Sequence, residues 1–287
     1  MSKGSTSPKL SDMQYRVINT LGTGAGSTIL LIADKKTSKR YALKVIKRAD
    51  ADDDIFIAQA QHEYEVLQKL NHSTILKIHD CRTRRRLFRL SGVDLLMEYV
   101  EGKTLDEVEA PTLSQLVLIF LQVAEGMIHM HRRGVFHGDL KPSNIMLTKS
   151  GRVKIIDFGT AWVRGHDKDR VQGTPYYMAP EQATEKVVDE RTDIYNFGAT
   201  LYRMFTGHYA NVGIPKVGEG GARTKIRPPI SLNPNLPAGL NETILACLET
   251  SPERRPENMH EVKKKLSAIA KVMGLKETDV DILADDE

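Results

Sequence analysis

Residues 137–144 read HGDLKPSN, and a short apolar run, IML, follows at residues 145–147. A second apolar run, VKII at residues 153–156, leads directly into DFG at residues 157–159. Two aspartates, an asparagine and a lysine therefore stand in turns between short apolar strands. Carboxylate and amide oxygens are the ligands that magnesium prefers. The other aspartate and the lysine suit the acceptance of a hydroxyl proton and the neutralisation of a phosphate. The pattern predicts a site for a metal-bound phosphate.

A glycine cluster, GTGAGS, occupies residues 22–27. The residues after it, 28–32, read as a strand, which excludes a dinucleotide-binding fingerprint because that motif needs a helix there. The Gly-Lys-Ser/Thr of the phosphate loop of nucleoside triphosphatases is also absent. What remains is a glycine-rich β-hairpin, whose backbone can approach phosphates closely. An ordinary hairpin turn fits the cluster equally well.

Lys44 stands midway along the apolar stretch YALKVI at residues 41–46. A lysine among core residues needs a partner for its charge. Glu63 and Glu65, on the helix expected next, are the candidates. From this segment alone, an exposed lysine on an edge strand is an equally good interpretation.

The chain changes character near residues 99–102. Before that point we expect a meander of short strands and one helix, and after it mainly helices. Strands are expected at residues 15–21, 28–33, 41–46, 75–78, 93–100, 145–147 and 153–156. Helices are expected at residues 57–70, 113–131, 193–206, 241–249 and 259–273. The sequence therefore predicts a small strand-rich unit followed by a larger helical one.

Composition excludes several classes of protein. The chain has 287 residues, a formal net charge of +4 and two cysteines, Cys81 and Cys247. Two distant cysteines exclude a disulfide framework and a cysteine-based zinc site. The charge gives no reason to expect nucleic-acid binding. The longest apolar run, residues 116–124, falls far short of the ~20 residues of a membrane span, and no signal peptide is visible, so we expect a cytoplasmic protein.

Five arginines crowd one short stretch: Arg82, Arg84, Arg85, Arg86 and Arg89. Short charge runs usually lie on solvated faces, so a solvated hairpin loop is the first interpretation. The alternative is a docking patch for an acidic partner or a membrane headgroup.

Taken together, the motifs resemble eukaryotic-type (Hanks-type) serine/threonine protein kinases, over about residues 15–273, and look most like the bacterial members. GTPYYMAPE at residues 173–181 resembles the substrate-binding segment, and DIYNFG at residues 193–198 the buried helix that anchors the catalytic loop. The implied fold is α+β: a bilobal protein kinase-like fold with a small antiparallel-sheet N-lobe, one main helix, and a larger helical C-lobe. We expect a flexible arm over residues 1–14, the kinase domain over 15–273 (lobes 15–100 and 101–273), and an acidic tail or linker over 274–287.

The resemblance also implies a mechanism. Asp139 would accept the proton of a protein hydroxyl, Lys141 would steady the transferred phosphoryl group, and Thr174 would brace both of them. Asn144 and Asp157 would hold Mg²⁺, with Mn²⁺ as a substitute. The residues with implied structural roles are Glu181, which would pair with Arg255, and Asp193.

ATP is the implied cofactor. The residues that the resemblance places around it are Leu21, Gly22, Gly24, Ile29, Ala42, Lys44, Glu63, Met97, Glu98, Val100, Met146 and Asp157. Glu63 is preferred to Glu65 as the partner of Lys44 because it lies seven residues before LNH at 70–72, which is the spacing of the family.

The chain departs from the family pattern at two places. Gly138 replaces the arginine that clamps a phosphorylated activation loop, and between Asp157 and Glu181 the only hydroxyl residues are Thr160, Thr174, Tyr176 and Tyr177. We therefore expect activity that does not depend on phosphorylation of this loop. Ser27 also stands in place of the third glycine of the glycine loop, with Gly26 one position early, so we expect looser phosphate coverage.

Two alternatives remain open. Small-molecule kinases of the aminoglycoside phosphotransferase type also carry His-Gly-Asp, but they lack the Ala-Pro-Glu segment and the Asp-x-Tyr-x-x-Gly helix that are present here. A pseudokinase scaffold would have lost one of the catalytic positions, all of which are intact. The protein substrate, the upstream signal and the oligomeric state cannot be read from the sequence.

Overall fold

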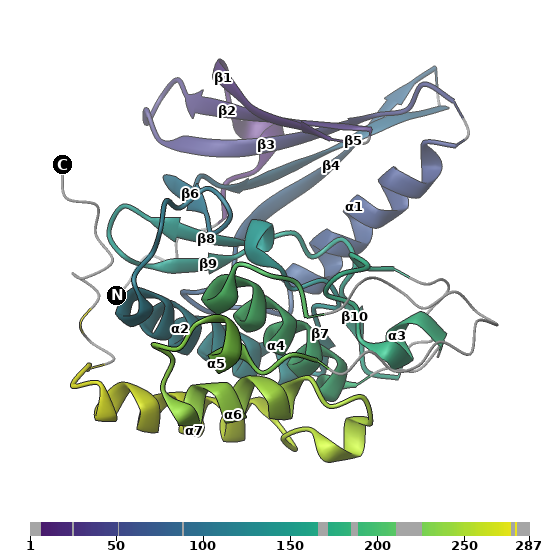
Figure 1. Ribbon diagram of the computed structural model, residues 1–287. Coiled ribbons are helices and arrows are strands. Elements are labelled where there is room, and N and C mark those ends of the chain that lie inside the picture. The colour runs from purple at the N-terminus through teal and green to yellow at the C-terminus, as the bar shows by residue number, and fades with distance from the viewer. Residues whose placement is uncertain are drawn as a thin grey trace, which may run out of the picture. The chain divides into compact units, whose positions relative to one another are not determined.

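The computed structural model describes residues 7–24, 26–50, 52–87, 89–165, 172–184, 189–210, 226–276 and 279. The chain divides into two compact units (Figure 1). The first comprises residues 1–71 and 75–101, and the second comprises residues 72–74 and 102–287. Most of the acidic tail expected after residue 274 lies outside the described residues.

The first unit is a five-stranded antiparallel sheet with one helix. The sheet order is β1-β2-β3-β5-β4. The strands are β1 (Tyr15–Gly24), β2 (Ser27–Asp34), β3 (Arg40–Lys47), β4 (Ile78–Arg86) and β5 (Arg89–Glu98). The helix α1 (Asp54–Leu67) packs against β4 and β5.

The core of the first unit forms where aliphatic side chains of neighbouring strands meet. Ile32, Leu43 and Leu96 are almost fully buried and pack together with Leu10. Leu10 belongs to the short 3-10 helix η1 (Leu10–Asp12), and its backbone amide donates to the Asp80 carboxylate over 2.7 Å. The expected arm over residues 1–14 is thus anchored at Leu10.

Two element predictions in this unit are wrong. Of the strand expected at residues 75–78, only an isolated bridge at Ile75 forms, and β4 begins at Ile78. Ile75 and Leu76 are buried, and a buried apolar stretch that forms only a single bridge gives the same apolar signal as a strand. The helix expected to reach Leu70 ends at Leu67, because the amides that follow it, of Lys69 and Leu70, bond three residues back and tighten the last turn.

The second unit is built on helices. They are α2 (Leu113–His131), α3 (Pro180–Thr184), α4 (Glu190–Thr206), α5 (Pro229–Leu232), α6 (Ala238–Cys247) and α7 (Met259–Val272). Two small sheets accompany them, β6 (Gly102–Thr104), β8 (Ile145–Thr148) and β9 (Val153–Ile155), and β7 (Val135–Phe136) with β10 (Trp162–Val163). The described part of this unit also contains two 3-10 helices, η2 (Pro142–Asn144) and η3 (Pro252–Arg254).

α2 is the central helix of this unit and begins at a capping box. The Thr112 side chain accepts from the Gln115 amide, and the Gln115 side chain accepts from the Thr112 amide. Among the described residues, α2 alone is long and apolar enough to cross a membrane. Most of it is buried against α7, α4 and β9, which is the environment of a core helix in a folded unit.

α4 and α6 approach each other closely at Gly198. A Cβ at this position would lie 2.6 Å from the Cβ of Cys247, a distance that packed side chains do not reach. Residue 198 of the DIYNFG motif must therefore be a glycine for the two helices to pack this closely. The close contact helps to fix α4, which carries the buried polar groups described below.

Candidate active site

Three of the expected catalytic residues meet in the second unit. Lys141 donates from Nζ to Oδ2 of Asp139 over 2.8 Å and to Oγ1 of Thr174 over 2.7 Å. The Thr174 amide donates to the other Asp139 oxygen, Oδ1, over 2.6 Å. Asp139 is buried, with 7% of its surface exposed. The aspartate is therefore held on both oxygens by groups 2 and 35 residues away in the chain.

Asn144 lies at the end of η2 and faces the same loop. Its side-chain nitrogen donates to the Asp139 carbonyl over 2.8 Å, which leaves the amide oxygen as the atom that can bind a cation. Its own carbonyl accepts from the Ile156 amide, next to Asp157. Asp157 adopts a left-handed conformation, with φ of 62°. Such a conformation costs free energy in a residue other than glycine and is often found at functional positions.

An amide oxygen and a carboxylate form the kind of incomplete oxygen set that Mg²⁺ uses when water and phosphate supply its other ligands. Asn144 and Asp157 therefore fit the metal that the resemblance implies. Among the described residues, no three His, Cys, Asp or Glu side chains group as a metal site.

Asp193 of α4 fixes the backbone just before Asp139. It is fully buried and accepts from the amides of His137 and Gly138, over 2.9 and 2.8 Å, and from Nε2 of His131 over 2.8 Å. Burial alone would raise the pKa of Asp193, but the hydrogen bond and charge of His131, with the Gly138 amide, outweigh it and lower the pKa. Asp193 thus remains a carboxylate that positions the catalytic loop.

Glu181 and Arg255 form a buried bidentate ion pair. The two guanidinium nitrogens lie 2.7 and 2.8 Å from the two carboxylate oxygens. Thr192 also donates to Glu181 over 2.8 Å, and the Arg255 guanidinium stacks over the ring of Tyr195. Burial raises the pKa of Glu181, but the hydrogen bond and charge of Arg255 lower it further than burial raises it. The pair ties the start of α3 to the segment after η3.

Two further residues, which the sequence did not single out, complete this framework. Gln182 is fully buried, and its side-chain nitrogen donates to the carbonyls of Gly138 and Gln172. Its oxygen accepts from Asn196 on α4, and Asn196 also donates to the Tyr177 carbonyl over 2.7 Å. The two amides connect the catalytic loop, the segment that carries Thr174, and α4. Gln182 directly follows the GTPYYMAPE segment, and Asn196 lies at a variable position of DIYNFG, so only their burial reveals the role.

The structure also explains Gly138. This residue is left-handed, with φ of 74°, and a Cβ there would overlap the ring of Trp162. Trp162 belongs to β10 and packs on Phe136 of β7, with ring centroids 5.9 Å apart. The aromatic side chains fill the space that a side chain at position 138 would need.

In the first unit, Lys44 pairs with Glu63. Its Nζ lies 2.7 Å from Oε2 of the glutamate, which is 1% exposed, whereas Glu65 is exposed. Lys44 lies on β3 and Glu63 on the inner face of α1. The charge of the strand lysine is thus balanced by the helix, as a lysine in this position requires.

The glycine hairpin forms between β1 and β2. Gly26 is left-handed, with φ of 68°, and a Cβ there would press against the Phe56 ring. Gly22 and Gly24 have room for a side chain. Ala25 lies outside the described residues. Gly26 is therefore required by the backbone itself, while Gly22 and Gly24 have no structural need to be glycine.

The remaining residues expected around ATP lie on both units. In the first unit, Ala42 lies opposite Met97 and Ile29 opposite Lys44 in the strand register, with Glu98 and Val100 close behind Met97 in the chain. Leu21 on β1 is 44% exposed. Met146 and Asp157 belong to the second unit. The adenine site that would combine these residues stays a prediction.

A buried aspartate braced by a lysine and a threonine, with oxygen ligands suited to a cation nearby, is chemistry that serves the transfer of phosphoryl groups. The chain belongs to the protein kinase domain family, whose model matches residues 15–266. The sequence-based recognition of this family and the α+β kinase fold class are thereby confirmed. Neither the small-molecule kinase nor the scaffold is favoured by the match. Proteins of this family generally use ATP and a divalent metal ion.

Similar curated proteins come from bacteria. A probable serine/threonine-protein kinase of Clostridium acetobutylicum is 29% identical over 276 residues, covering 89% of this chain and 40% of the relative. Serine/threonine-protein kinase PknB of Mycobacterium leprae is 29% identical, covering 91% and 43%. PknB of Mycobacterium tuberculosis is 30% identical, covering 91% and 44%. The chain thus spans about two fifths of the length of the curated relatives it matches.

Proposed function

We propose that this chain is a serine/threonine protein kinase that transfers the γ-phosphate of ATP to hydroxyl groups of protein substrates. The observation that carries the proposal is the Asp139–Lys141–Thr174 cluster, in which both oxygens of a buried carboxylate are held in place. The family match and the names of the bacterial relatives support it.

The residues divide the chemistry between them. A carboxylate oxygen of Asp139 accepts the proton of the substrate hydroxyl. In the same step the hydroxyl oxygen bonds to the γ-phosphorus, and the bond between that phosphorus and the departing ADP oxygen breaks. The Lys141 ammonium, positioned by Thr174, neutralises charge on the transferred group. Asn144 and Asp157 would hold Mg²⁺ with ATP, and Mn²⁺, which has the same coordination chemistry, would be its substitute. The metal supplies charge neutralisation on the phosphates.

Lys44 has a separate task. Its ammonium, held by Glu63, suits contact with the α- and β-phosphates, because a paired but partly exposed lysine keeps both its charge and its direction. The preference for serine and threonine over tyrosine rests on Lys141 and Thr174, which together brace Asp139.

Activity is proposed to be independent of activation-loop phosphorylation. Position 138 lacks the arginine that would clamp a phosphate, and Trp162 fills the adjacent space. Thr174 is held by Lys141 and Asp139 themselves, through its hydroxyl and its backbone amide. Full activity of phosphatase-treated protein is expected; loss of activity on treatment would contradict the proposal.

The deciding experiment compares the wild type with Asp139→Asn. Each is incubated with ATP and Mg²⁺, and phosphate incorporation is measured on the chain itself and on a generic basic protein. We expect incorporation by the wild type and a fall of at least about a hundredfold in the variant, the range for loss of a catalytic base. Equal incorporation in both would refute the role of Asp139. None in either would favour the scaffold, and transfer to aminoglycosides or choline-like alcohols would favour the small-molecule kinase.

The setting of the whole protein is also a proposal. A cytoplasmic kinase acting on protein substrates, and not on nucleic acid, agrees with the composition of the chain, and any membrane anchor would lie in a longer protein. Fractionation of the source cells, followed by detection of the chain, would test the location.

A further inference from the structure

The arginine-rich hairpin of β4 and β5 contains two sets of arginines, and only one of them has a structural role. Arg82 and Arg84 reach the buried carboxylate of Asp94, over 2.9 and 3.0 Å. Arg84 also donates to the Ile46 carbonyl over 2.7 Å. These two arginines hold the hairpin to the sheet, so the expectation of a solvated loop is wrong for them. The other three are exposed, with no side-chain hydrogen bond or ion pair among the described residues: Arg85, Arg86 and Arg89.

The hairpin ends in a tight turn that carries an aliphatic side chain. β4 ends at Arg86, β5 begins at Arg89, and these two residues lie opposite each other in the register. Leu87 follows Arg86, is left-handed with φ of 49°, and is 86% exposed. Phe88 lies outside the described residues. Two-residue turns favour Asn, Asp or Gly where φ is positive. A leucine there adds backbone strain and leaves its side chain in water, so the turn itself gives no reason for it.

The charges around Leu87 are also unfavourable for the hairpin by itself. Arg86 and Arg89 lie directly opposite each other, and like charges in that arrangement destabilise a pair of strands. Arg85 adds a third exposed positive charge beside them. Because no carboxylate among the described residues pairs with any of the three, an anion bound at the tip would relieve the repulsion.

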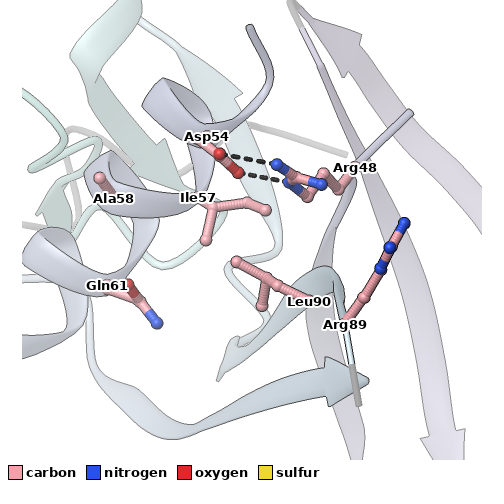
Figure 2. Close-up of a pocket in the computed structure, with 7 residues that line it drawn as sticks. All are labelled: Arg48, Asp54, Ile57, Ala58, Gln61, Arg89 and Leu90. Atoms are coloured by element: carbon pink, nitrogen blue, oxygen red, sulfur yellow. Dashed lines mark hydrogen bonds and ion pairs between the residues drawn. The ribbon is translucent and has the colours of Figure 1, made fainter. Parts of the chain in front are cut away.

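The base of the turn is occupied by other contacts. Figure 2 shows the hollow between α1 and the start of β5, where Leu90 faces Ile57 of the helix. Arg89 extends away from α1 there, whereas the Arg48 guanidinium donates two hydrogen bonds to Asp54. The carboxylate that lines this hollow is therefore already paired, and it does not neutralise Arg89.

We propose that the tip of this hairpin is a peripheral contact for an anionic membrane surface. Leu87 enters the boundary between headgroups and acyl chains, and the three exposed arginines bind lipid phosphates around it. Guanidinium groups suit this task because they donate to two phosphate oxygens at once. An apolar apex surrounded by positive charges matches the order of layers in such a surface. The contact lies at the bilayer surface and is not a membrane span.

The shape of the tip selects a lipid surface over a protein or a nucleic acid. A stable protein interface buries ~800 Å² on each partner, and a tight turn with a single aliphatic side chain offers little of that area. A bilayer needs no complementary groove, because its headgroups rearrange around an inserted side chain. Duplex nucleic acid would neutralise the arginines but leave Leu87 in water.

Binding through this tip is weak and reversible, since stable attachment to a membrane takes more than one such signal. Each arginine near an anionic surface changes the affinity about fivefold. The contact does not depend on the proposed phosphoryl transfer, so it is tested separately from it.

Sedimentation with vesicles measures the binding of the full chain. Vesicles of phosphatidylcholine and phosphatidylglycerol in equal amounts are compared with vesicles of phosphatidylcholine alone. Leu87→Asn removes the aliphatic side chain in favour of a residue that accepts a left-handed conformation. Val272→Asn is the matched control, because Val272 is 85% exposed and lies at the end of α7, in the other unit.

We expect binding to the mixed vesicles and binding at least about tenfold weaker to phosphatidylcholine alone. Leu87→Asn should weaken binding to the mixed vesicles about fivefold or more, by loss of apolar burial, without lowering the melting temperature. Val272→Asn should change binding by less than about twofold. Failure of the wild type to bind, or equal binding by Leu87→Asn and the wild type, would overturn the proposal.

The charged part of the contact has its own pair of variants. Arg86→Gln combined with Arg89→Gln should weaken binding about tenfold or more, because two phosphate contacts are lost. Arg16→Gln combined with Lys36→Gln removes the same charge from exposed positions elsewhere in the first unit and should cost less than about threefold. Equal weakening by the two double variants would show general attraction to net charge and overturn the proposal.

A depth measurement identifies the partner. In Leu87→Trp, the emission of the new indole should shift to the blue with mixed vesicles and be quenched by brominated lipid. Trp162, the one tryptophan of the chain, is buried and gives a constant background. Absence of quenching would overturn the proposal, and so would tighter binding to a poly-glutamate peptide or to duplex DNA than to the vesicles. All binding is repeated on Asp139→Asn, so that a failure of the kinase assignment leaves the membrane result standing.

Discussion

The ring of Trp162 occupies the space beside Gly138 that any side chain at this position would need. Gly138 is also left-handed, a conformation that costs other residues about 1–2 kcal/mol. The two constraints act on the residue directly before Asp139. An arginine at position 138 is therefore incompatible with the packing of Trp162 on β10 against Phe136 on β7.

Gly138→Ala should lower both stability and turnover. The new Cβ adds steric overlap with Trp162 to the backbone strain, and we expect a loss of about 2–4 kcal/mol in the free energy of unfolding by strain and overpacking together. Urea unfolding and initial rates of phosphate incorporation measure the two effects. The matched control is Gly207→Ala, because Gly207 is also left-handed, with φ of 75°, but has nothing within 4 Å of its Cβ position. Equal losses in the two variants would show that Trp162 adds nothing.

Thr174→Val should reduce turnover while leaving the fold intact. The substitution removes the hydroxyl that accepts from Lys141 but keeps the backbone amide that donates to Asp139. A hydrogen bond from a charged donor contributes about 1.5–3 kcal/mol, so we expect kcat to fall about 10- to 100-fold. Thr174→Ser, which retains the hydroxyl, is the control and should stay near wild type. A wild-type rate in Thr174→Val would remove Thr174 from the catalytic group.

Gln182→Leu should destabilise the second unit. It removes the side-chain donor from the buried carbonyl of Gly138, at about 1–3 kcal/mol for a buried unpaired group, and from the half-buried carbonyl of Gln172. Turnover should fall with it, because the Gly138 carbonyl belongs to the catalytic loop. Thermal unfolding is the measurement. Gln68→Leu, at an exposed position with one long side-chain hydrogen bond, is the control and should change stability by less than about 0.5 kcal/mol.

Arg255→Met should cost about 3–5 kcal/mol of stability near neutral pH, because it leaves the Glu181 carboxylate buried without its partner. The pH dependence of stability tests the role of charge more directly. In the wild type the folded pKa of Glu181 lies below its ordinary value of 4.5, so the stability that the pair contributes is present above pH 4.5 and is lost as the pH falls through the folded pKa.

In the Arg255→Met protein we expect the sign to reverse, because burial, the largest influence on the folded pKa of Glu181, then raises it against only the smaller lowering effects of the Thr192 hydroxyl and a backbone hydrogen bond. Protonation neutralises the stranded carboxylate, so the deficit relative to wild type should shrink on acidification. Denaturant unfolding at pH 7 and near pH 4.5 compares the two proteins. A deficit that stays constant with pH would show that the loss comes from packing against Tyr195 and not from charge.

The sequence located most of the candidate site because its motifs combine residue types that have few other uses. HGDLKPSN placed an aspartate, a lysine and an asparagine in one loop, and the structure brings them together. The spacing to LNH at residues 70–72 selected Glu63 over Glu65, and Glu63 is the residue within 2.7 Å of Lys44. The spacing between motifs predicts such pairs well because it is set by helix periodicity and strand length, which depend on the local sequence.

The residues that the sequence did not reveal act through contacts distant in the chain. Gln182 meets Gly138 across 44 positions, and an amide in a polar segment gives no sign of complete burial. Trp162 gives no sign that its ring excludes a side chain at position 138. The five arginines of residues 82–89 likewise look alike in the sequence. In the structure, Asp94 pairs with Arg82 and Arg84 and not with the other three. Tertiary partners decide these cases.

Asp193 gives the catalytic loop an unusual kinetic protection. The backbone amides of His137 and Gly138 donate to the Asp193 carboxylate, which has no exposed surface, and not to a backbone carbonyl as in a strand or helix. Their hydrogens can exchange with solvent only when the carboxylate itself becomes accessible, which requires the core of the unit to open. In deuterated water, these two loop amides should therefore exchange as slowly as those in the middle of α2.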